Sequence, residues 1–198
     1  IENRHPQDGS YNARFSANSR SESWAYKNLP SSSVLYFQEY VLLSSLPTSG
    51  NRLYLGTIQA NSRNSVEVFV ENRGGNYYWG LLTIVNGRSY FNREAVASNP
   101  QAGTYYAVEF CRDTVADECK LWVDGTLKID VDRTNVGGAS RVYSGITGAN
   151  AKTVVYIDNV KVSDSYIGIS NFLEDLQAEP NISRGFPFIF SGSVLFFL

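Results

Sequence analysis

Apolar and polar residues alternate along most of this chain, in short runs separated by clusters of Gly, Ser, Asn and Asp. Alternation with a period of two predicts half-buried β-strands, because successive side chains of a strand point to opposite faces. We expect about eleven strands, which include Ser10–Ala17, Ser23–Asn28, Val34–Leu43, Arg52–Gln59, Ser65–Glu71, Tyr77–Ile84, Arg141–Ile146 and Thr153–Val162. Closely spaced strands without a βαβ rhythm predict an all-β fold, an antiparallel β-sandwich or jelly roll.

Turn residues separate these runs. Leu29-Pro30-Ser31-Ser32-Ser33 predicts the turn that ends the second strand, and Asn86-Gly87 predicts a type I′ hairpin turn, in which both central residues need positive φ. A further turn is expected at 47–50 and a loop over 98–103. The long apolar run Val34–Leu43 is expected to be a central strand, covered on both faces.

The region 104–130 predicts two successive hairpins. Its first strand carries Tyr106, Val108 and Phe110 on one face, and Asp124-Gly125 forms the second turn. Cys111 and Cys119 flank the first loop and are the chain's two cysteines, so we expect a structural disulfide and folding outside the reducing cytosol. A redox or metal pair is the alternative, but two thiols with no nearby His supply too few ligands for zinc.

The last thirty residues or so differ in character from the rest. Residues 171–179 have helical spacing, and 186–198 carry no charge. At this length the apolar tail is too short to span a bilayer as a helix, and it would aggregate if exposed. It can add a strand to its own sheet, insert into a neighbouring subunit, or be the cut end of a membrane anchor. The residues assigned to burial or assembly are Phe186, Phe188, Phe190, Val194 and Phe196.

We therefore expect a jelly-roll domain over 1–168, followed by a helix, linker and apolar tail over 169–198. Aromatic residues make up 14% of the chain and charged residues 18%, which is typical of an extracellular all-β module, secreted or at the cell surface. A net charge of −2 argues against nucleic acid as a partner, because the chain has no basic stripe to contact phosphates. Asn181-Ile182-Ser183 is an N-glycosylation sequon.

Three segments resemble the concanavalin A-like lectin/glucanase superfamily, and its laminin-G-like jelly-roll modules in particular. Residues 8–15 (DGSYNARF) look like the family's strand after a Gly-Ser-Tyr turn, and Thr104–Gly125 matches its central hairpin, which ends in Leu-Trp-Val-Asp-Gly. Val155–Gly168 (VYIDNVKVSDSYIG) matches its closing strand. The resemblance covers about residues 8–168 and implies the fold, which hosts lectins, hydrolases, lyases and adhesive spacers. Such modules usually begin with one more strand, and the apolar tail is a candidate for that place.

Hydrolases of this superfamily carry acids spaced E-x-D-x-E on one strand. The nearest match is Glu67 and Glu71, with Phe69 where the Asp would stand. The strand reads equally well with Val66, Val68 and Val70 inward and both glutamates toward water. We therefore lean against an enzyme, and a glycosidase is the third choice of function.

No metal or cofactor is required by the sequence. Asp158 lies between apolar residues and is a candidate calcium ligand, a turn acceptor or a surface residue; Asp124, Asp130 and Asp132 are near in sequence only to one another. The single histidine, His5, offers no convincing Ser-His-Asp arrangement.

The cluster Tyr77-Tyr78-Trp79 is the best binding candidate, with Tyr77 and Trp79 on one face and Asn76, Arg73 and Asn72 nearby. Sugars dock on aromatic faces while their hydroxyls reach amide and charged groups. Core packing is the alternative for these rings, and Trp24 and Trp122 are expected in the core. The function predicted first is non-catalytic glycan binding or adhesion. The second is a structural subunit of a fibre or coat that binds copies of itself by strand addition.

Overall fold

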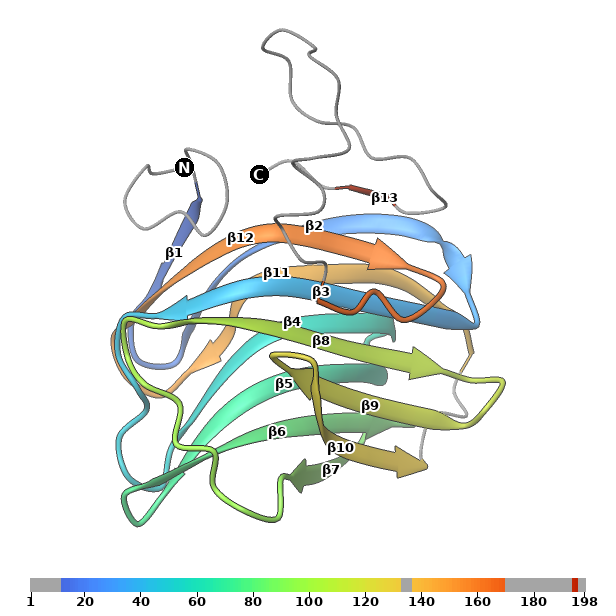
Figure 1. Ribbon diagram of the computed structural model, residues 1–198. Coiled ribbons are helices and arrows are strands. Elements are labelled where there is room, and N and C mark those ends of the chain that lie inside the picture. Colours follow the sequence, from blue (N-terminus) through green and yellow to red (C-terminus); the bar gives the residue numbers. More distant parts are fainter. Residues whose placement is uncertain (1–11, 133–136, 170–193, 196–198) are drawn as a thin grey trace, which may run out of the picture.

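The computed structural model describes residues 12–132, 137–169 and 194–195. In these residues the chain forms two antiparallel sheets packed face to face, as Figure 1 shows. One sheet has the order β1-β12-β3-β8-β9-β10, with β13 also paired to β12, and the other has the order β2-β11-β4-β5-β6-β7. The strands are β1 (Ala13–Ala17), β2 (Ser21–Ser32), β3 (Val34–Leu43), β4 (Arg52–Asn61), β5 (Asn64–Arg73), β6 (Asn76–Val85), β7 (Arg88–Arg93), β8 (Tyr105–Asp113), β9 (Glu118–Val123), β10 (Thr126–Asp132), β11 (Ala139–Ala149), β12 (Thr153–Ser163) and β13 (Val194–Leu195).

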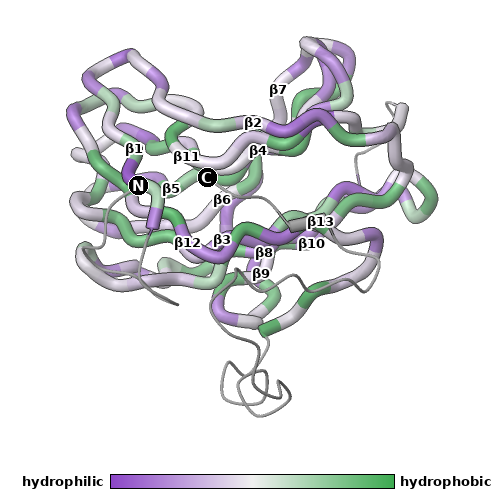
Figure 2. Tube along the Cα trace, turned by 90° about the horizontal axis from the view of Figure 1, so that it is seen from above, coloured by the Kyte–Doolittle hydropathy of each residue, from purple (hydrophilic) through white to green (hydrophobic). Residues whose placement is uncertain are grey.

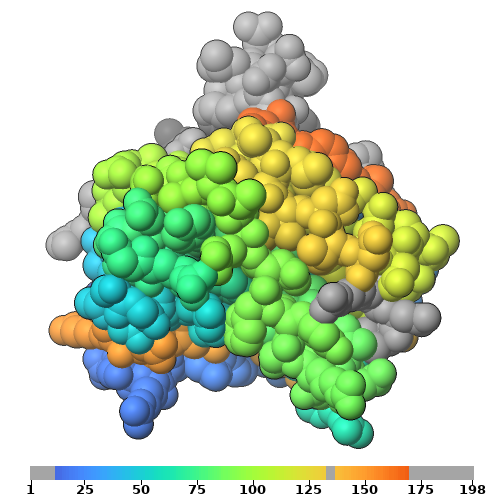
Figure 3. Space-filling view, turned by 90° about the horizontal axis from the view of Figure 1, so that it is seen from below, coloured from blue at the N-terminus to red at the C-terminus, as the bar shows by residue number. Residues whose placement is uncertain are grey.

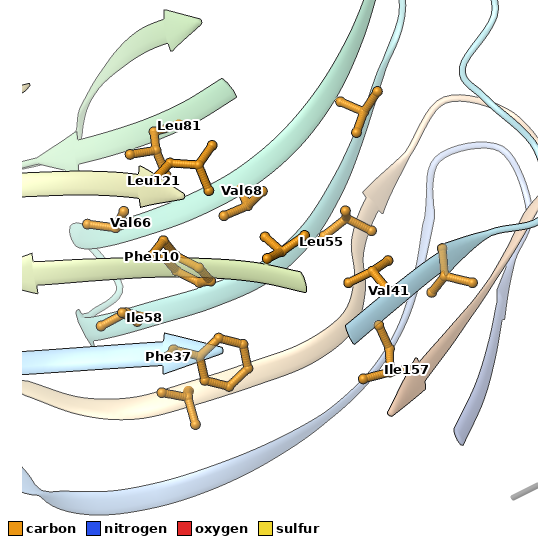
Figure 4. Packing of buried hydrophobic residues seen from close by; sticks show 14 of the residues in the cluster. Phe37, Val41, Leu55, Ile58, Val66, Val68, Leu81, Phe110, Leu121 and Ile157 are labelled. Atoms are coloured by element: carbon orange, nitrogen blue, oxygen red, sulfur yellow. The ribbon is translucent and has the colours of Figure 1, made fainter. Parts of the chain in front are cut away.

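The core lies between the two sheets and is filled by every second residue of the inner strands. Val66, Val68 and Val70 of β5 point inward, as one of the two interpretations of that strand predicted. From the opposite sheet Phe37 and Phe110 meet with ring centroids 5.3 Å apart (Figure 4). Burying one such side chain stabilises the fold by about 1.5–3 kcal/mol.

The turn chemistry predicted from sequence is confirmed. Asn86 and Gly87 have φ of 53° and 80°, and Asp124 and Gly125 have φ of 49° and 71°. Both pairs join neighbouring antiparallel strands, β6 to β7 and β9 to β10. Type I′ turns place both central residues at positive φ, which Asn, Asp and Gly tolerate better than other residues.

The turn expected at 29–33 is wrong, because β2 continues through Pro30 to Ser32. β2 is the edge strand of its sheet, so the missing N–H of a proline there can face solvent without breaking a ladder hydrogen bond. The prediction of β3 as a central strand is confirmed, since it lies between β12 and β8.

The predicted disulfide is not supported. The register pairs Cys111 with Lys120, and Arg112 with Cys119. Directly paired residues share a face and consecutive residues do not, so the two thiols lie on opposite faces of the sheet. Neither cysteine forms a disulfide and both are buried, so the argument for an oxidising compartment from a disulfide is lost.

One end of the sandwich is closed by the segment between β7 and β8. The Glu94 carboxylate accepts hydrogen bonds from the Trp79 and Ser98 backbone N–H groups, at 3.0 and 2.9 Å. Lys128 of β10 lies 3.7 Å from the same carboxylate. Figure 3 looks at this end of the molecule, where the green segment after β7 runs beside the yellow β10. Glu94 thus connects the edge strands of the two sheets.

Within the described part of the chain there is no helix, and so none that is long and apolar enough to cross a membrane. The helix predicted at 171–179, the sequon at Asn181 and His5 lie outside the described residues. The same holds for Phe186, Phe188, Phe190 and Phe196.

Candidate functional site: the outer face of the β2–β7 sheet

The outer faces of the two sheets differ in what covers them. On the β1–β10 sheet, the segment after β12 crosses the face: Tyr166 packs on Trp122 with ring centroids 4.9 Å apart. The Ile167 and Gly168 N–H groups donate to Glu109 at 2.7 and 2.9 Å. This segment buries Glu109, which raises the pKa of its carboxyl against the opposing effect of those hydrogen bonds.

The outer face of the β2–β7 sheet, by contrast, carries exposed aromatic side chains. Trp24 and Tyr26 are 40% and 55% exposed, and Phe91 is 49% exposed. In Figure 2 β2, β11, β4 and β7 lie on one side of the molecule, and the outline of this layer dips between its two ends. We take this aromatic outer face as the candidate site.

Three rings form one half of the site. Trp24 stands edge-on to Tyr143 and to Tyr26, with ring centroids 5.0 and 5.8 Å apart. The register explains this cluster, because Tyr26 is directly opposite Tyr143 and Trp24 is opposite Gly145. A Cβ on Gly145, whose φ is 114°, would lie 2.7 Å from the Ser23 carbonyl oxygen. Glycine therefore lets β11 approach β2 closely beneath the indole.

A chain of polar groups holds these rings in place. Arg141 donates from Nε to Asn28 Oδ1 at 2.7 Å and from Nη1 to the Tyr143 hydroxyl at 3.1 Å. The Tyr143 hydroxyl donates to Gln59 Oε1 at 3.0 Å, and the Arg141 guanidinium lies over the Tyr26 ring, 5.1 Å from its centroid. The network fixes the orientation of the rings and leaves amide and guanidinium groups beside them.

Glu67 lies near the middle of the face, with Thr57 and Leu82 opposite it on the neighbouring strands. Burial raises the pKa of its carboxyl, the Ser65 hydroxyl hydrogen bond at 3.1 Å opposes this, and the negative charge of Glu22 raises the pKa further. Glu22 is on β2, with β11 and β4 between it and β5. Glu22 also accepts a hydrogen bond from Trp24 Nε1 at 2.9 Å.

The other half of the site is built around Arg52. Its guanidinium lies over the rings of Phe91 and Phe69, 4.2 and 5.3 Å from their centroids, and donates to Glu71 at 2.7 Å. Phe69 in turn covers Gly80, where a Cβ would lie 2.1 Å from the ring. The absence of a side chain at Gly80 lets Phe69 lie flat beneath Arg52.

The structure places the predicted aromatic residues on both sides of the sheet. Trp79 is 1% exposed and packs in the core against Tyr106, with centroids 5.6 Å apart. Tyr77 is partly buried against the same core. The outward residue is Tyr78, with the Arg93 guanidinium 5.4 Å from its ring centroid. Core packing, the alternative interpretation of Trp79, is what the structure shows.

The polar residues predicted beside them lie at the β5–β6 hairpin. Asn72 is buried and donates to the Pro47 carbonyl at 2.9 Å, and its Oδ1 accepts from the Gly75 N–H at 3.0 Å. Arg73 and Asn76 are exposed and directly paired, at the end of the ladder. Asn72 thus organises a turn, while Arg73 and Asn76 are away from the rings of Trp24 and Tyr143.

The acid pair on β5 is separated by a covered ring. Glu67 and Glu71 both lie on the outer face, with Phe69, 1% exposed, between them. Glu71 is held by Arg52 at 2.7 Å and approached by Arg93 at 4.0 Å. Glu71 is thus engaged by arginines, and the Phe69 ring lies between it and Glu67.

Two of the aspartates considered for calcium accept hydrogen bonds from the backbone, and Asp130 lies 3.6 Å from Lys120 Nζ. Asp158 Oδ1 accepts from the Asn159 N–H at 2.8 Å, and Asp124 Oδ1 accepts from the Ala107 N–H at 2.9 Å. Among the residues that the structure describes, no group of three or more His, Cys, Asp or Glu side chains lies together.

Sequence reasoning missed the exposed half of the site. Trp24 and Trp122 were expected in the core, but both are on outer faces, Trp24 exposed and Trp122 beneath Tyr166. The spacing of Trp24, Tyr26 and Asn28, at every second position along β2, does indicate that these three side chains share one face.

No protein-family model matches the chain, and no curated protein matches it in sequence. Solved structures do match in fold. "Cellulose induced protein, Cip1" is 10% identical with a TM-score of 0.67, over 85% of this chain and 86% of that one. A heptameric SAP-like pentraxin from Limulus polyphemus is 14% identical with a TM-score of 0.53, over 92% and 90%. An alginate lyase from Alteromonas is 9% identical with a TM-score of 0.55, over 81% and 90%. The structural neighbours are concanavalin A-like jelly-roll proteins, so the fold expected from the resemblance is confirmed.

Proposed function

We propose that this protein is a non-catalytic carbohydrate-binding module that acts outside the cell. It would hold a glycan on the outer face of the β2–β7 sheet. The observation that supports this best is the pair of exposed rings, Trp24 and Tyr26, with Arg141, Asn28 and Gln59 arranged beside them. Aromatic rings give a sugar a flat apolar surface, and the polar groups supply directional hydrogen bonds to its hydroxyls.

The fold supports the proposal without specifying a ligand. One neighbour in fold is the binding domain of botulinum neurotoxin DC in complex with SialylT, 6% identical with a TM-score of 0.57 over 86% of this chain and 42% of that one. The same architecture includes an alginate lyase. We do not propose catalysis, because Glu71 is ion-paired and Phe69 stands between the two glutamates.

The proposal is tested on a glycan array, followed by calorimetry with any glycan retained. We expect Trp24→Ala to lose at least tenfold in affinity, which corresponds to about 1.4 kcal/mol. Tyr166→Ala is the matched control, because Tyr166 is a comparably exposed ring on the other sheet. Equal binding by wild type and Trp24→Ala would exclude this face as the site, and no retention of any glycan by folded wild type would exclude the function.

A further inference from the structure

One edge of β12 is shared between two short strands. β1 pairs with its first half, from Ala13 opposite Ile157 to Ala17 opposite Thr153. β13 pairs with its second half, with Leu195 opposite Lys161 and Val194 opposite Val162. Both pairings are antiparallel, and Figure 1 shows β1 and β13 at opposite ends of β12. The other edge of β12 is occupied by β3.

A bulge in β12 divides these two halves. The register with β3 shifts between Asp158 and Lys161, and Asn159 has a φ of 48°. The Asp158 carboxylate accepts the Asn159 N–H and supports this conformation. Because a bulge bends and twists its strand, a straight continuation of β1 would not follow the second half of β12.

The second half of β12 belongs to the core. Val160 and Val162 are 7% and 3% exposed, and Val162 is opposite Phe37 of β3. An unpaired edge here would leave backbone N–H and C=O groups without partners beside an apolar core, which favours pairing with another chain. A further strand with apolar residues at every second position would pair these backbone groups and cover the apolar core.

The chain contains such a segment. Residues 186–198 carry no charge, and Val194 is the residue already opposite Val162. The intervening residues 170–193 can reach well across a domain at up to about 3.3 Å per residue. A partner from the same chain is therefore within reach, and its pairing costs no association entropy.

We propose that the β12 edge from residue 158 to 163 is the docking site for the apolar C-terminal segment of the same chain. This segment extends the sheet beside the second half of β12, next to the half that β1 occupies. It is then an integral strand of the sandwich and does not link subunits.

Disulfide trapping tests the proposed register. In Lys161→Cys/Leu195→Cys the new thiols are directly opposite each other, whereas in the control Ser163→Cys/Leu195→Cys they are diagonal neighbours. Opposed residues lie within disulfide reach, and diagonal ones are about 7–8 Å apart. The two native thiols are buried, so they interfere little.

We expect the first pair to form an intrachain bond in a monomer, with at least tenfold more product than the control. Cross-linked dimers at dilute concentration would overturn the proposal in favour of strand exchange between copies. Equal, low yields from both pairs would also overturn it.

Hydrogen exchange on the unmodified protein gives a second readout that does not depend on variant folding. Successive N–H groups of β12 point alternately toward β3 and toward β13, so β3 protects one of the Lys161 and Val162 amides in any case. Protection of both amides would agree with pairing, and rapid exchange at one of them would contradict it. Neither result depends on glycan binding, so the proposed function can fail while this inference holds.

Discussion

The Glu39 carboxyl of β3 accepts a 2.6 Å hydrogen bond from the Ser144 hydroxyl of β11, across the core between the two sheets. Glu39 is fully buried. The loss of water raises the pKa of this carboxyl from 4.5 to about 8, although hydrogen bonds from the Ser144 hydroxyl and the Gly56 backbone oppose the rise. The protonated acid is therefore the form that the folded core favours.

This predicts a pH dependence of stability. The folded state keeps a proton on Glu39 that the unfolded state releases above about pH 4.5, so this contribution is full below that pH and is lost as pH rises through about 8. Between those values the free energy of unfolding should fall by up to about 1.4 kcal/mol per pH unit. Denaturant unfolding from pH 5 to 9 measures this slope. Glu39→Gln should flatten it, and an unchanged slope in that variant would assign the dependence elsewhere.

The polar network beneath the aromatic site should contribute to glycan affinity. Tyr143→Phe removes the hydroxyl that joins Arg141 to Gln59 but keeps the ring. A hydrogen bond contributes about 0.5–1.5 kcal/mol. If this energy is lost from the binding free energy, the glycan affinity measured by calorimetry should fall by roughly 2- to 12-fold. Tyr166→Phe is the control, because it also removes one phenol hydroxyl but lies over the other sheet, where Tyr166 packs on Trp122. If both variants bind alike, the network has no role in recognition.

Close packing at Gly80 should be sensitive to a single methyl group. Gly80→Ala would place Cβ 2.1 Å from the Phe69 ring, and such overpacking costs about 1–3 kcal/mol. Thermal denaturation should show the loss. Phe69→Leu in the same chain should recover part of it, because the smaller side chain vacates the space above residue 80. Simple additivity of the two substitutions would contradict this packing relationship.

The two cysteines should remain reduced thiols in the folded protein. Burial raises the pKa of the Cys111 thiol to about 12 and also raises that of Cys119, so little reactive thiolate forms near neutral pH. We expect slow alkylation of the native protein, rapid alkylation of both thiols in denaturant, and the same melting temperature with and without reductant. A lower melting temperature in reductant would indicate a disulfide after all.

Sequence patterns correctly predicted the features that depend only on residues close together in the chain. Asn86-Gly87 and Asp124-Gly125 form their turns because positive φ is a property of those residues. Alternation also correctly placed Val66, Val68 and Val70 on one face of β5. Pro30 misled the prediction, since a proline ends a central strand but is accepted at an edge, and the sequence does not state which strands are at edges.

The amino-acid sequence by itself determined that the chain forms antiparallel strands and which residues of each strand share a face. Only the tertiary structure decided which of the two faces is buried. Trp79 lies in the core and Trp24 in the open although β6 and β2 belong to the same sheet, because Trp79 points to the face that packs against the other sheet and Trp24 to the outer face. The register of the β8–β9 hairpin separated Cys111 from Cys119, because a shift of one residue moves a side chain to the other face of the sheet.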